Sequence, residues 1–211
     1  LRNHGMKATF MAKPFASLPG SGMHLHLSLY DNQGESLLAL KNSKKLNQAV
    51  SGILDLMPES MIFCAPHANS YHRFEENSYA PINATWGKDN RTTALRIPSG
   101  NEDSTRIEHR LSGADANPYL VMAMLISGFI HGIEENPEIP PETIGNGYED
   151  GSRPLPQSWE AALDLFQNKS RLSSILGQEF STLYRQLKFG EQKRFRRVIT
   201  PHEYDWYLHT V

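Results

Sequence analysis

The sequence has 211 residues, 39% of them hydrophobic, which predicts one sizeable core, alone or with a small helical appendage. The 21 basic and 23 acidic residues leave a formal net charge of −2, so the composition gives no general indication of a nucleic-acid-binding protein. The single cysteine, Cys64, excludes an internal disulfide framework and is typical of a reducing compartment, so we expect a cytoplasmic protein.

The first 30 residues contain two predicted strands separated by a glycine-rich turn. One strand is expected over 8–11 (ATFM), and the turn follows at 19–22 (PGSG). Apolar and polar residues then alternate completely over 23–29, which puts His24, His26 and Ser28 on one face. A lone histidine is usually structural, but two histidines aligned beside a glycine turn favour ligands that face a cleft.

Residues 31–81 are predicted to contain a scaffold followed by loops. The turn at 31–34 (DNQG) is expected to close a hairpin with 37–40, and a helix is expected from about Ser43. The apolar residues of this helix lie at core spacing: Leu46, Val50, Ile53, Leu54 and Met57. The polar stretch 64–73 is loop-like, a common setting for binding residues, and 74–81 (FEENSYAP) is typical of a mobile flap.

Arginines gather in the stretch 90–110, NRTTALRIPSGNEDSTRIEHR. They are Arg91, Arg96, Arg106 and Arg110. If 106–111 is a strand, Arg106, Glu108 and Arg110 share one face, and the alternate residues Ile107, His109 and Leu111 share the other. Several converging guanidinium groups suit a ligand with several negative charges, such as a phosphate. A salt-bridged surface hairpin is the alternative that this stretch leaves open.

The rest of the chain is predicted to be largely helical. Asn117 and Pro118 open a long apolar helix, with an Asn cap and Pro at its first position. Its apolar run, 119–133, is shorter than the roughly 20 residues that a bilayer requires, so we expect a buried helix and no membrane partner. Residues 136–157, with five prolines, form an extended surface excursion, and 158–211 form a helical tail. The basic run 193–197 is interpreted as an exposed helix face rather than a nucleic-acid site.

The candidate residues suggest a divalent cation beside a phosphate. A histidine and a carboxylate on neighbouring strands could hold the cation while the arginines hold the phosphate. One nitrogen and one carboxylate do not complete an octahedral site, so further carboxylates are expected from outside these residues. This agrees with the start at Leu1, without an initiator methionine, from which we expect a fragment of a longer chain. The turn at 19–22 lacks the lysine and the helix context of a Walker-type loop.

Six short motifs follow one another along the first two thirds of the chain. They are KP at 13–14, GSGMHLH at 20–26, NSYHR at 69–73, NR to IP across 90–98, RIEHR at 106–110 and ANPYL at 116–120. In type and order they resemble the catalytic domain of the glutamine synthetase family, over most of 7–135. The resemblance implies an α+β fold, incomplete at its N-terminus: a curved antiparallel sheet carries the site on its concave face (1–135), and helices pack outside it.

The resemblance also implies a ligase, in which ATP phosphorylates the γ-carboxylate of glutamate and an amine attacks the γ-glutamyl phosphate. By motif position, His24 and Glu108 correspond to ligands of Mg²⁺ or Mn²⁺. The implied glutamate-binding residues are Gly20 at the amino group, Arg73 at the carboxylate and Arg110 at the γ-carboxylate end. The implied nucleotide and phosphate residues are His26, Ser28, Arg91, Arg96 and Arg106. Such chemistry needs positive charge where phosphoryl charge develops.

Two departures from the family pattern affect the expected substrate. Pro19 replaces the usual Asn before the glycine turn, which removes one polar contact. Tyr79 stands where ammonia-using members carry a flap glutamate that binds ammonium. A neutral aromatic suits the carbon chain of a larger amine, so we favour the γ-glutamylpolyamine synthetase branch, with amines such as putrescine. Glu75 or Glu76 could still serve if the flap aligns differently, which would indicate glutamine synthetase proper.

Further alternatives and partners follow from the same residues. A catalytically silent structural or regulatory homologue is disfavoured by the retained arginines, His24 and Glu108, and a basic binding module would rest on 193–197 alone. Family members complete each site with a domain from a neighbouring subunit of a ring. We therefore expect a homo-oligomeric ring for the full-length protein, and we expect residues 1–211 alone to be inactive and to bind metal weakly.

Overall fold

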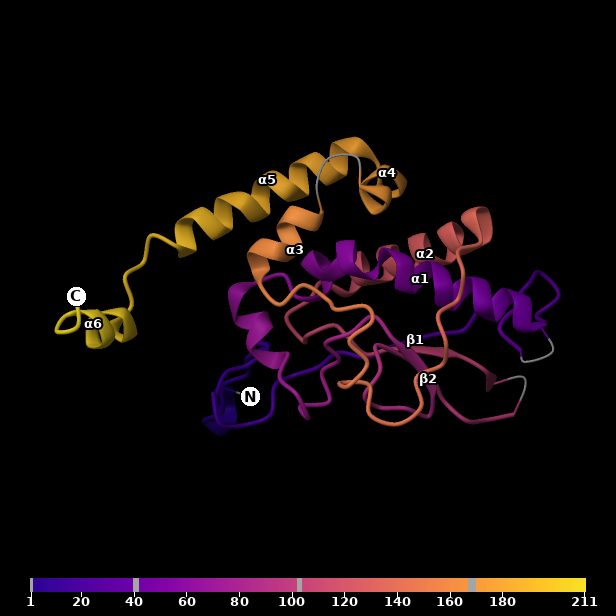
Figure 1. Ribbon diagram of the computed structural model, residues 1–211, viewed down its shortest axis with the longest axis horizontal. Helices are drawn as coiled ribbons and strands as arrows, with labels where there is room; N and C mark the ends of the chain where they lie inside the picture. The colour runs from indigo at the N-terminus through magenta and orange to yellow at the C-terminus, as the bar shows by residue number, and fades with distance from the viewer. Residues whose placement is uncertain (1, 40–41, 102–103, 167–169) are drawn as a thin grey trace.

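The computed structural model describes residues 2–39, 42–101, 104–166 and 170–211. It has the predicted α+β class, with two long helices lying side by side over a small sheet and further helices outside them (Figure 1). Two short 3₁₀ helices are also present: η1 (Arg2–His4) precedes the first strand, and η3 (Ala68–Arg73) follows α1 (Ser43–Cys64). The sheet carries the predicted site residues, and the helices provide the core behind it.

The sheet contains four short strands: β1 (Leu25–Leu27), β2 (Trp86–Lys88), β3 (Leu95–Ile97) and β4 (Ile107–His109). Their order is β1-β4-β3-β2, and β4 is antiparallel to both of its neighbours. The β2–β3 pair is parallel, so the sheet is mixed, where an antiparallel sheet was expected. The cause is the connection 89–94, which returns the chain to the starting end of β2 instead of forming a hairpin.

The N-terminal strand predicted over 8–11 is absent, and that prediction was wrong. These residues are exposed and irregular, because no neighbouring strand is hydrogen-bonded to them. The segment is fixed instead at Lys13, whose backbone N–H donates to Asn69 Oδ1 at 2.9 Å and whose carbonyl accepts from Asn69 Nδ2 at 2.9 Å. The predicted hairpin is reduced to a bridge between Tyr30 and Ser36, and Leu40, its expected end, lies outside the described residues.

The core is built around α1 (Ser43–Cys64) and α2 (Pro118–Glu135). The predicted core residues of α1 are buried, and the side chain of Asn117 caps α2 by accepting from the N–H of Tyr119, as the sequence indicated. The outer face of α2 remains exposed at Ile126, Ile130 and Ile133, so this helix is only half-buried. Within the described ranges, no helix combines the length and apolarity needed to cross a membrane.

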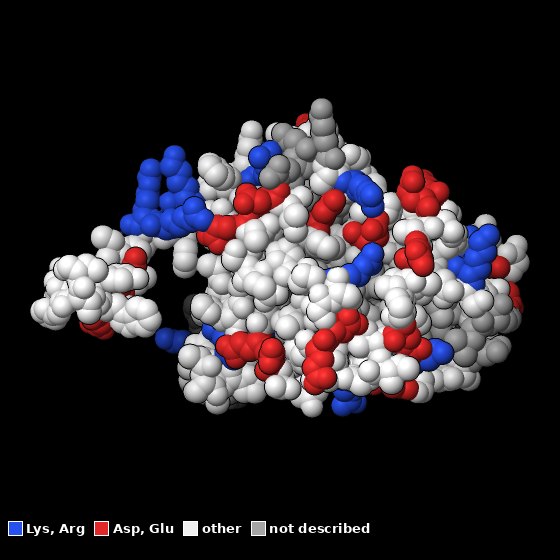
Figure 2. All heavy atoms as spheres, in the orientation of Figure 1, with Lys and Arg blue, Asp and Glu red and all other residues white. Residues whose placement is uncertain are grey.

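The helical tail comprises α3 (Trp159–Leu165), α4 (Arg171–Leu176), α5 (Gln178–Phe195) and α6 (Pro201–Tyr207). The sequence did not indicate α4. Helix α5 is fixed to the body by the hydroxyl of Tyr184, which donates to the Ile62 carbonyl, and α6 projects away from the body (Figure 1). The basic run is exposed, as predicted, and basic side chains gather where α5 ends (Figure 2).

The excursion 136–157 is irregular, as predicted, but it is not wholly superficial. Its Thr143 N–H donates to the Trp86 carbonyl at 2.9 Å, so the segment covers the β2 edge of the sheet. Its Gly147 carbonyl accepts from Asn83 Nδ2 at 3.0 Å, and Tyr148 is buried. The excursion therefore lies against both the sheet and the flap (74–81).

Candidate active site

Glu108 lies at the centre of the predicted site, on the middle of β4, and is only 4% exposed. Arg96 Nη1 donates to its Oε2 at 2.8 Å, and Arg110 Nη1 donates to its Oε1 at 2.8 Å. Burial raises the pKa of Glu108, but the hydrogen bonds and charges of the two arginines outweigh burial and hold the pKa below its ordinary value. Glu108 is therefore a buried carboxylate that stays charged.

His24, the residue directly before β1, faces the same carboxylate. Its Nδ1 lies 3.1 Å from Glu108 Oε1, so the two predicted metal ligands are brought together on one side of the sheet. Burial, followed by the positive charge of Arg110, lowers the pKa of His24 although Glu108 acts in the opposite direction. The imidazole is thus neutral near pH 7, which is the form that binds metal ions.

These two side chains fit part of a divalent metal site. A charged carboxylate is a suitable donor for Mg²⁺ or Mn²⁺, and a neutral imidazole is a common metal ligand. Among the described residues, however, there is no group of three or more His, Cys, Asp or Glu side chains that could hold an ion. His24 and Glu108 therefore need donors from outside this set.

The remaining predicted phosphate and nucleotide residues differ in how they are held. Arg106 Nε donates to His26 Nδ1 at 3.2 Å, joining two of them. The Arg91 carbonyl accepts from Arg110 Nη2 at 3.0 Å, while its exposed guanidinium makes no hydrogen bond or ion pair within the described part of the chain. Ser28 is also exposed, on the His26 face of the segment. The Arg91 side chain is therefore available to an anion.

A cavity of about 230 Å³ joins the predicted substrate residues. It is lined by Gly20, Gly22, His24, Arg73, Ser78, Tyr79, Ala80 and Arg110. These residues come from the glycine turn, the residue before β1, η3, the flap and the residue that follows β4. The sequence predicted five of them as site residues, and the cavity shows that they meet.

Arg73 is the feature of this cavity that most needs explanation. It is 6% exposed, and it makes no ion pair with any carboxylate of the described residues. Its Nη1 donates to the Leu111 carbonyl at 3.1 Å. Burial lowers the pKa of Arg73, partly offset by the charge of Asp115, but a guanidinium keeps its proton at neutral pH. A buried, unpaired cation beside a cavity indicates a site for an anion.

The glycine turn makes room for this arginine. A Cβ atom on Gly20 would lie 2.7 Å from Arg73 Cγ and 2.8 Å from the Ala12 carbonyl oxygen. A Cβ atom on Gly22 would lie 3.3 Å from Arg73 Nη2. The small residues at these two positions thus allow the backbone to pack directly against the Arg73 side chain.

The flap places an aromatic residue, and no carboxylate, at the cavity. Tyr79 lines the cavity while remaining 63% exposed, and its φ of 59° lies in the left-handed region. Ser78 Oγ donates to the Arg73 carbonyl at 2.9 Å, which ties the flap to η3. Glu75 points elsewhere, with its Oε2 3.9 Å from Lys13 Nζ, and neither Glu75 nor Glu76 lines the cavity.

Two functional contacts were missed by the sequence reasoning. Asp89 Oδ1 accepts from Arg96 Nη2 at 2.9 Å, so it shares this arginine with Glu108. Tyr148 donates its hydroxyl hydrogen to the Ala80 carbonyl at 3.1 Å, across 68 positions of the sequence. Turn-forming residues around Asp89 and Tyr148 indicate loops, but no local pattern indicates these partners.

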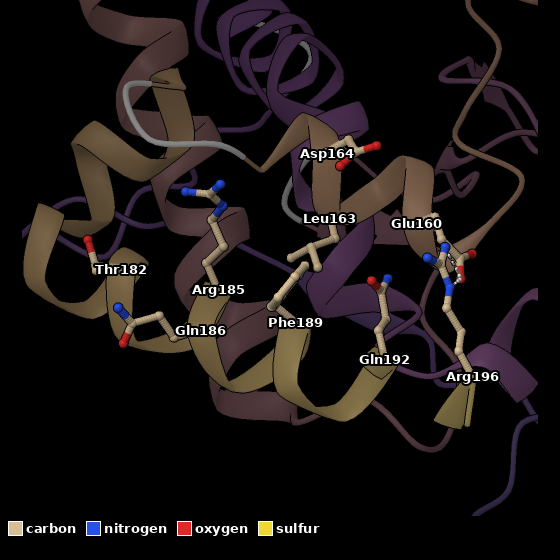
Figure 3. Close-up of a pocket in the computed structure, with 9 residues that line it drawn as sticks. All are labelled: Glu160, Leu163, Asp164, Thr182, Arg185, Gln186, Phe189, Gln192 and Arg196. Atoms are coloured by element: carbon tan, nitrogen blue, oxygen red, sulfur yellow. Dashed lines mark hydrogen bonds and ion pairs between the residues drawn. The ribbon is translucent and has the colours of Figure 1, made fainter. Parts of the chain in front are cut away.

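A larger cavity of about 430 Å³ lies between α3 and α5 (Figure 3). None of the predicted site residues lines it. Arg196, at its rim, is already paired with Glu160, with Arg196 Nη2 3.0 Å from Glu160 Oε1. The candidate site is therefore the smaller cavity at the sheet.

Comparison with known proteins connects this geometry to characterised enzymes. The family described as glutamine synthetase, catalytic domain, matches residues 1–207. The chain is 44% identical over 208 residues to γ-glutamylputrescine synthetase PuuA of Escherichia coli (strain K12), covering 97% of the chain and 44% of that protein. It is 38% identical over 206 residues to γ-glutamylethanolamide synthetase GlnA4 of Streptomyces coelicolor, covering 97% and 43%.

Solved structures also match this chain. The structure of GmaS without ligand superposes with a TM-score of 0.86 at 29% sequence identity, covering 99% of this chain and 49% of that chain. The chain thus spans less than half the length of the relatives it matches.

Proposed function

This chain belongs to the glutamine synthetase family, and on that premise we propose that it forms the catalytic part of a longer ATP-dependent ligase. The enzyme joins an amine to the γ-carboxylate of glutamate through a γ-glutamyl phosphate, and the amine is a polyamine such as putrescine. The active assembly is a homo-oligomeric ring in the cytoplasm, and residues 1–211, as sheet region, excursion and helical tail, are inactive alone.

The single observation that carries this proposal is the unpaired guanidinium of Arg73. Arg73 and Arg110 are both buried, and both line the 230 Å³ cavity. Arg110 is committed to Glu108, whereas Arg73 has no carboxylate partner in the described chain. A glutamate whose α-carboxylate pairs with Arg73, and whose γ-carboxylate extends toward Arg110, gives Arg73 the carboxylate partner that the described chain does not supply. Gly20 lies beside its amino group in this arrangement.

The remaining residues hold charge where the phosphoryl group transfers. Arg91 and Arg96 stabilise the negative charge of the transferring phosphate, and they need only hold their position to do so. His26, Ser28 and Arg106 face the nucleotide. His24 and Glu108, with carboxylates supplied from elsewhere, would hold Mg²⁺ or Mn²⁺, which neutralises phosphate charge when bound.

The residues of the flap favour an amine with a carbon chain, rather than ammonium, as the substrate. A small buried cation needs a carboxylate for stabilisation, and none of the described residues that line the cavity has one. Tyr79 offers an aromatic surface that packs against methylene groups and attracts a protonated amine. The names of two relatives, a γ-glutamylputrescine synthetase and a γ-glutamylethanolamide synthetase, agree with this choice.

The test measures phosphate release from ATP by the full-length protein with glutamate and a panel of amines. We expect putrescine to be used faster than ammonia. A preference for ammonia would identify glutamine synthetase proper, and no release with any amine would identify a catalytically silent homologue.

A matched pair of variants then tests whether Arg73 binds glutamate. Arg73→Gln removes the buried cation and is expected to lower kcat/KM for glutamate about 30- to 5,000-fold, the usual range for loss of one partner of a buried charge pair. Arg194→Gln removes an exposed arginine of α5 and is expected to leave kcat/KM within about twofold. Equal effects of the two substitutions would contradict the assignment of Arg73.

A further inference from the structure

The flap holds a conformation that its own sequence does not favour. Asn77 has φ 62° and Tyr79 has φ 59°, and both lie in the left-handed region that residues with a Cβ atom seldom occupy. Such conformations persist where the surrounding structure imposes them. The contacts that fix residues 75–80 therefore determine where Tyr79 stands at the cavity.

Most of these contacts are local. The hydroxyl of Ser78 lies 2.6 Å from the Glu75 carbonyl and 2.9 Å from the Arg73 carbonyl, and the Ala80 N–H donates back to Ser78 Oγ at 3.2 Å. A long-range hydrogen bond is added by Tyr148, which donates from the excursion to the Ala80 carbonyl at 3.1 Å. This bond adjoins Tyr79 directly and joins the flap to a separate part of the chain.

Tyr148 is itself firmly placed. The N–H of Gly147 donates to Thr92 Oγ1 at 2.8 Å, and the Gly147 carbonyl accepts from Asn83 Nδ2 at 3.0 Å. A Cβ atom on Gly147 would lie 2.9 Å from the Thr92 carbonyl oxygen, so the two backbones are in close contact. Thr92 follows Arg91 in the connection 89–94 between β2 and β3. The excursion thus links this connection to the flap. Burial raises the pKa of Tyr148, which therefore remains a protonated donor.

We propose that Tyr148 is a positioning residue that holds the flap over the cavity and thereby sets the affinity for the amine substrate. The amine part of this inference rests on the proposed function. Tyr148 does not line the cavity, and it acts through the Ala80 carbonyl and the neighbouring Tyr79 side chain.

The test uses Tyr148→Phe in the full-length protein, because this change removes only the hydroxyl. Loss of one neutral hydrogen bond is expected to raise the KM for putrescine about three- to tenfold. The KM for glutamate and the kcat at saturating amine are expected to stay within about twofold, because Arg73 and Arg110 keep their places. An unchanged amine KM would overturn the proposal.

Tyr184→Phe is the matched control. Tyr184 is also 9% exposed, and its hydroxyl also donates to a backbone carbonyl at 3.1 Å, that of Ile62, away from the flap. We expect it to lower thermal stability as much as Tyr148→Phe does while leaving the amine KM unchanged. An equal rise in amine KM for both variants would overturn the proposal, because the effect would then be one of general stability.

A double-substitution cycle tests the route through Tyr79. In a Tyr79→Ala background, Tyr148→Phe is expected to have little further effect on amine KM, because the side chain that it positions is gone. A full, additive effect in that background would overturn the proposed route.

Amide hydrogen exchange provides a readout that needs no activity. Tyr148→Phe is expected to speed exchange in peptides that cover residues 75–80, and Tyr184→Phe is not. Unchanged exchange in both would overturn the proposal even in an active enzyme. If the wild-type protein released no phosphate with any amine, the proposed function and the proposed effect on amine affinity would both be wrong. Hydrogen exchange would still decide whether Tyr148 holds the flap.

Discussion

Gly20 illustrates how one residue acts by what it lacks. The turn 19–22 suggested a ligand site because glycine turns commonly border one, but its direct role in the structure is steric. Gly20 leaves the space that the Arg73 side chain occupies, and Ala12 closes the other side of that space with its carbonyl. The position of Arg73 therefore depends on a residue 53 positions earlier in the sequence.

Gly20→Ala should accordingly weaken glutamate binding. The new Cβ would lie 2.7 Å from Arg73 Cγ and 2.8 Å from the Ala12 carbonyl oxygen, so the guanidinium must move. Overpacking of this kind costs about 1–3 kcal/mol, which predicts a glutamate KM higher by roughly 5- to 100-fold in steady-state assays of the full-length enzyme. Gly151→Ala is the control, since its Cβ meets nothing within 4 Å. A glutamate KM that stays the same in both would contradict the packing argument.

At the residue scale, the sequence predicts the faces of strands better than it predicts contacts. The twofold period of a strand was sufficient to group His24 with His26 and Glu108 with Arg110, because alternation is a local property, whereas the structure shows that His24 and Glu108 face each other. The unpaired state of Arg73 depends on which carboxylates fold near it, and the Tyr148–Ala80 bond joins residues 68 positions apart. Such contacts follow from tertiary packing and have no local signal.

At the scale of elements, the close approach of α1 and α2 depends on glycines. A Cβ atom on Gly128 would lie 2.7 Å from Ile53 Cα and 2.8 Å from Ile53 Cγ1, and a Cβ atom on Gly52 or Gly132 would lie closer still to the backbone of the facing helix. Because these glycines lie where the two backbones meet, any side chain there must push the helices apart.

We predict opposite effects for two glycine-to-alanine changes in helices. Gly128→Ala is expected to destabilise the full-length protein by about 1–3 kcal/mol through overpacking between α1 and α2. Gly190→Ala, in α5, meets nothing within 4 Å and is expected to be neutral or to stabilise by up to about 1 kcal/mol, the helix preference of alanine. Denaturant unfolding of both variants measures the difference. Similar changes in stability would show that backbone contact does not set the spacing of α1 and α2.

The elements that the sequence predicted well are those with a local sequence pattern of their own. Helical spacing predicted α1, and the Asn117 cap with Pro118 predicted where α2 begins. The strand expected over 8–11 failed because a strand needs a hydrogen-bonded neighbour, which sequence alone does not supply. The parallel β2–β3 pair was missed for a related reason, since the path of residues 89–94 depends on Asn90, whose Nδ2 donates to the carbonyls of Thr143 and Gly145.

For the molecule as a whole, the site is gathered from the glycine turn, η3, the flap and the sheet, yet the described residues provide few metal donors. His24 and Glu108 are two donors, and the described residues contain no third acidic, histidine or cysteine side chain grouped with them. Both oxygens of Glu108 already accept hydrogen bonds from arginines. A divalent ion that has only these two ligands to replace its water shell gains little free energy on binding.

We therefore predict weak metal binding by the 211-residue chain and tight binding by the full-length protein. Calorimetric titration with Mn²⁺ should show no stoichiometric binding by the chain, once circular dichroism has verified that it is helical. In the full-length protein, Glu108→Gln should lower Mn²⁺ affinity by at least about tenfold, because a charged ligand is lost, while Glu138→Gln, in the excursion, should not. Tight, one-to-one binding by the chain alone would contradict the incomplete site, since His24 and Glu108 would then suffice.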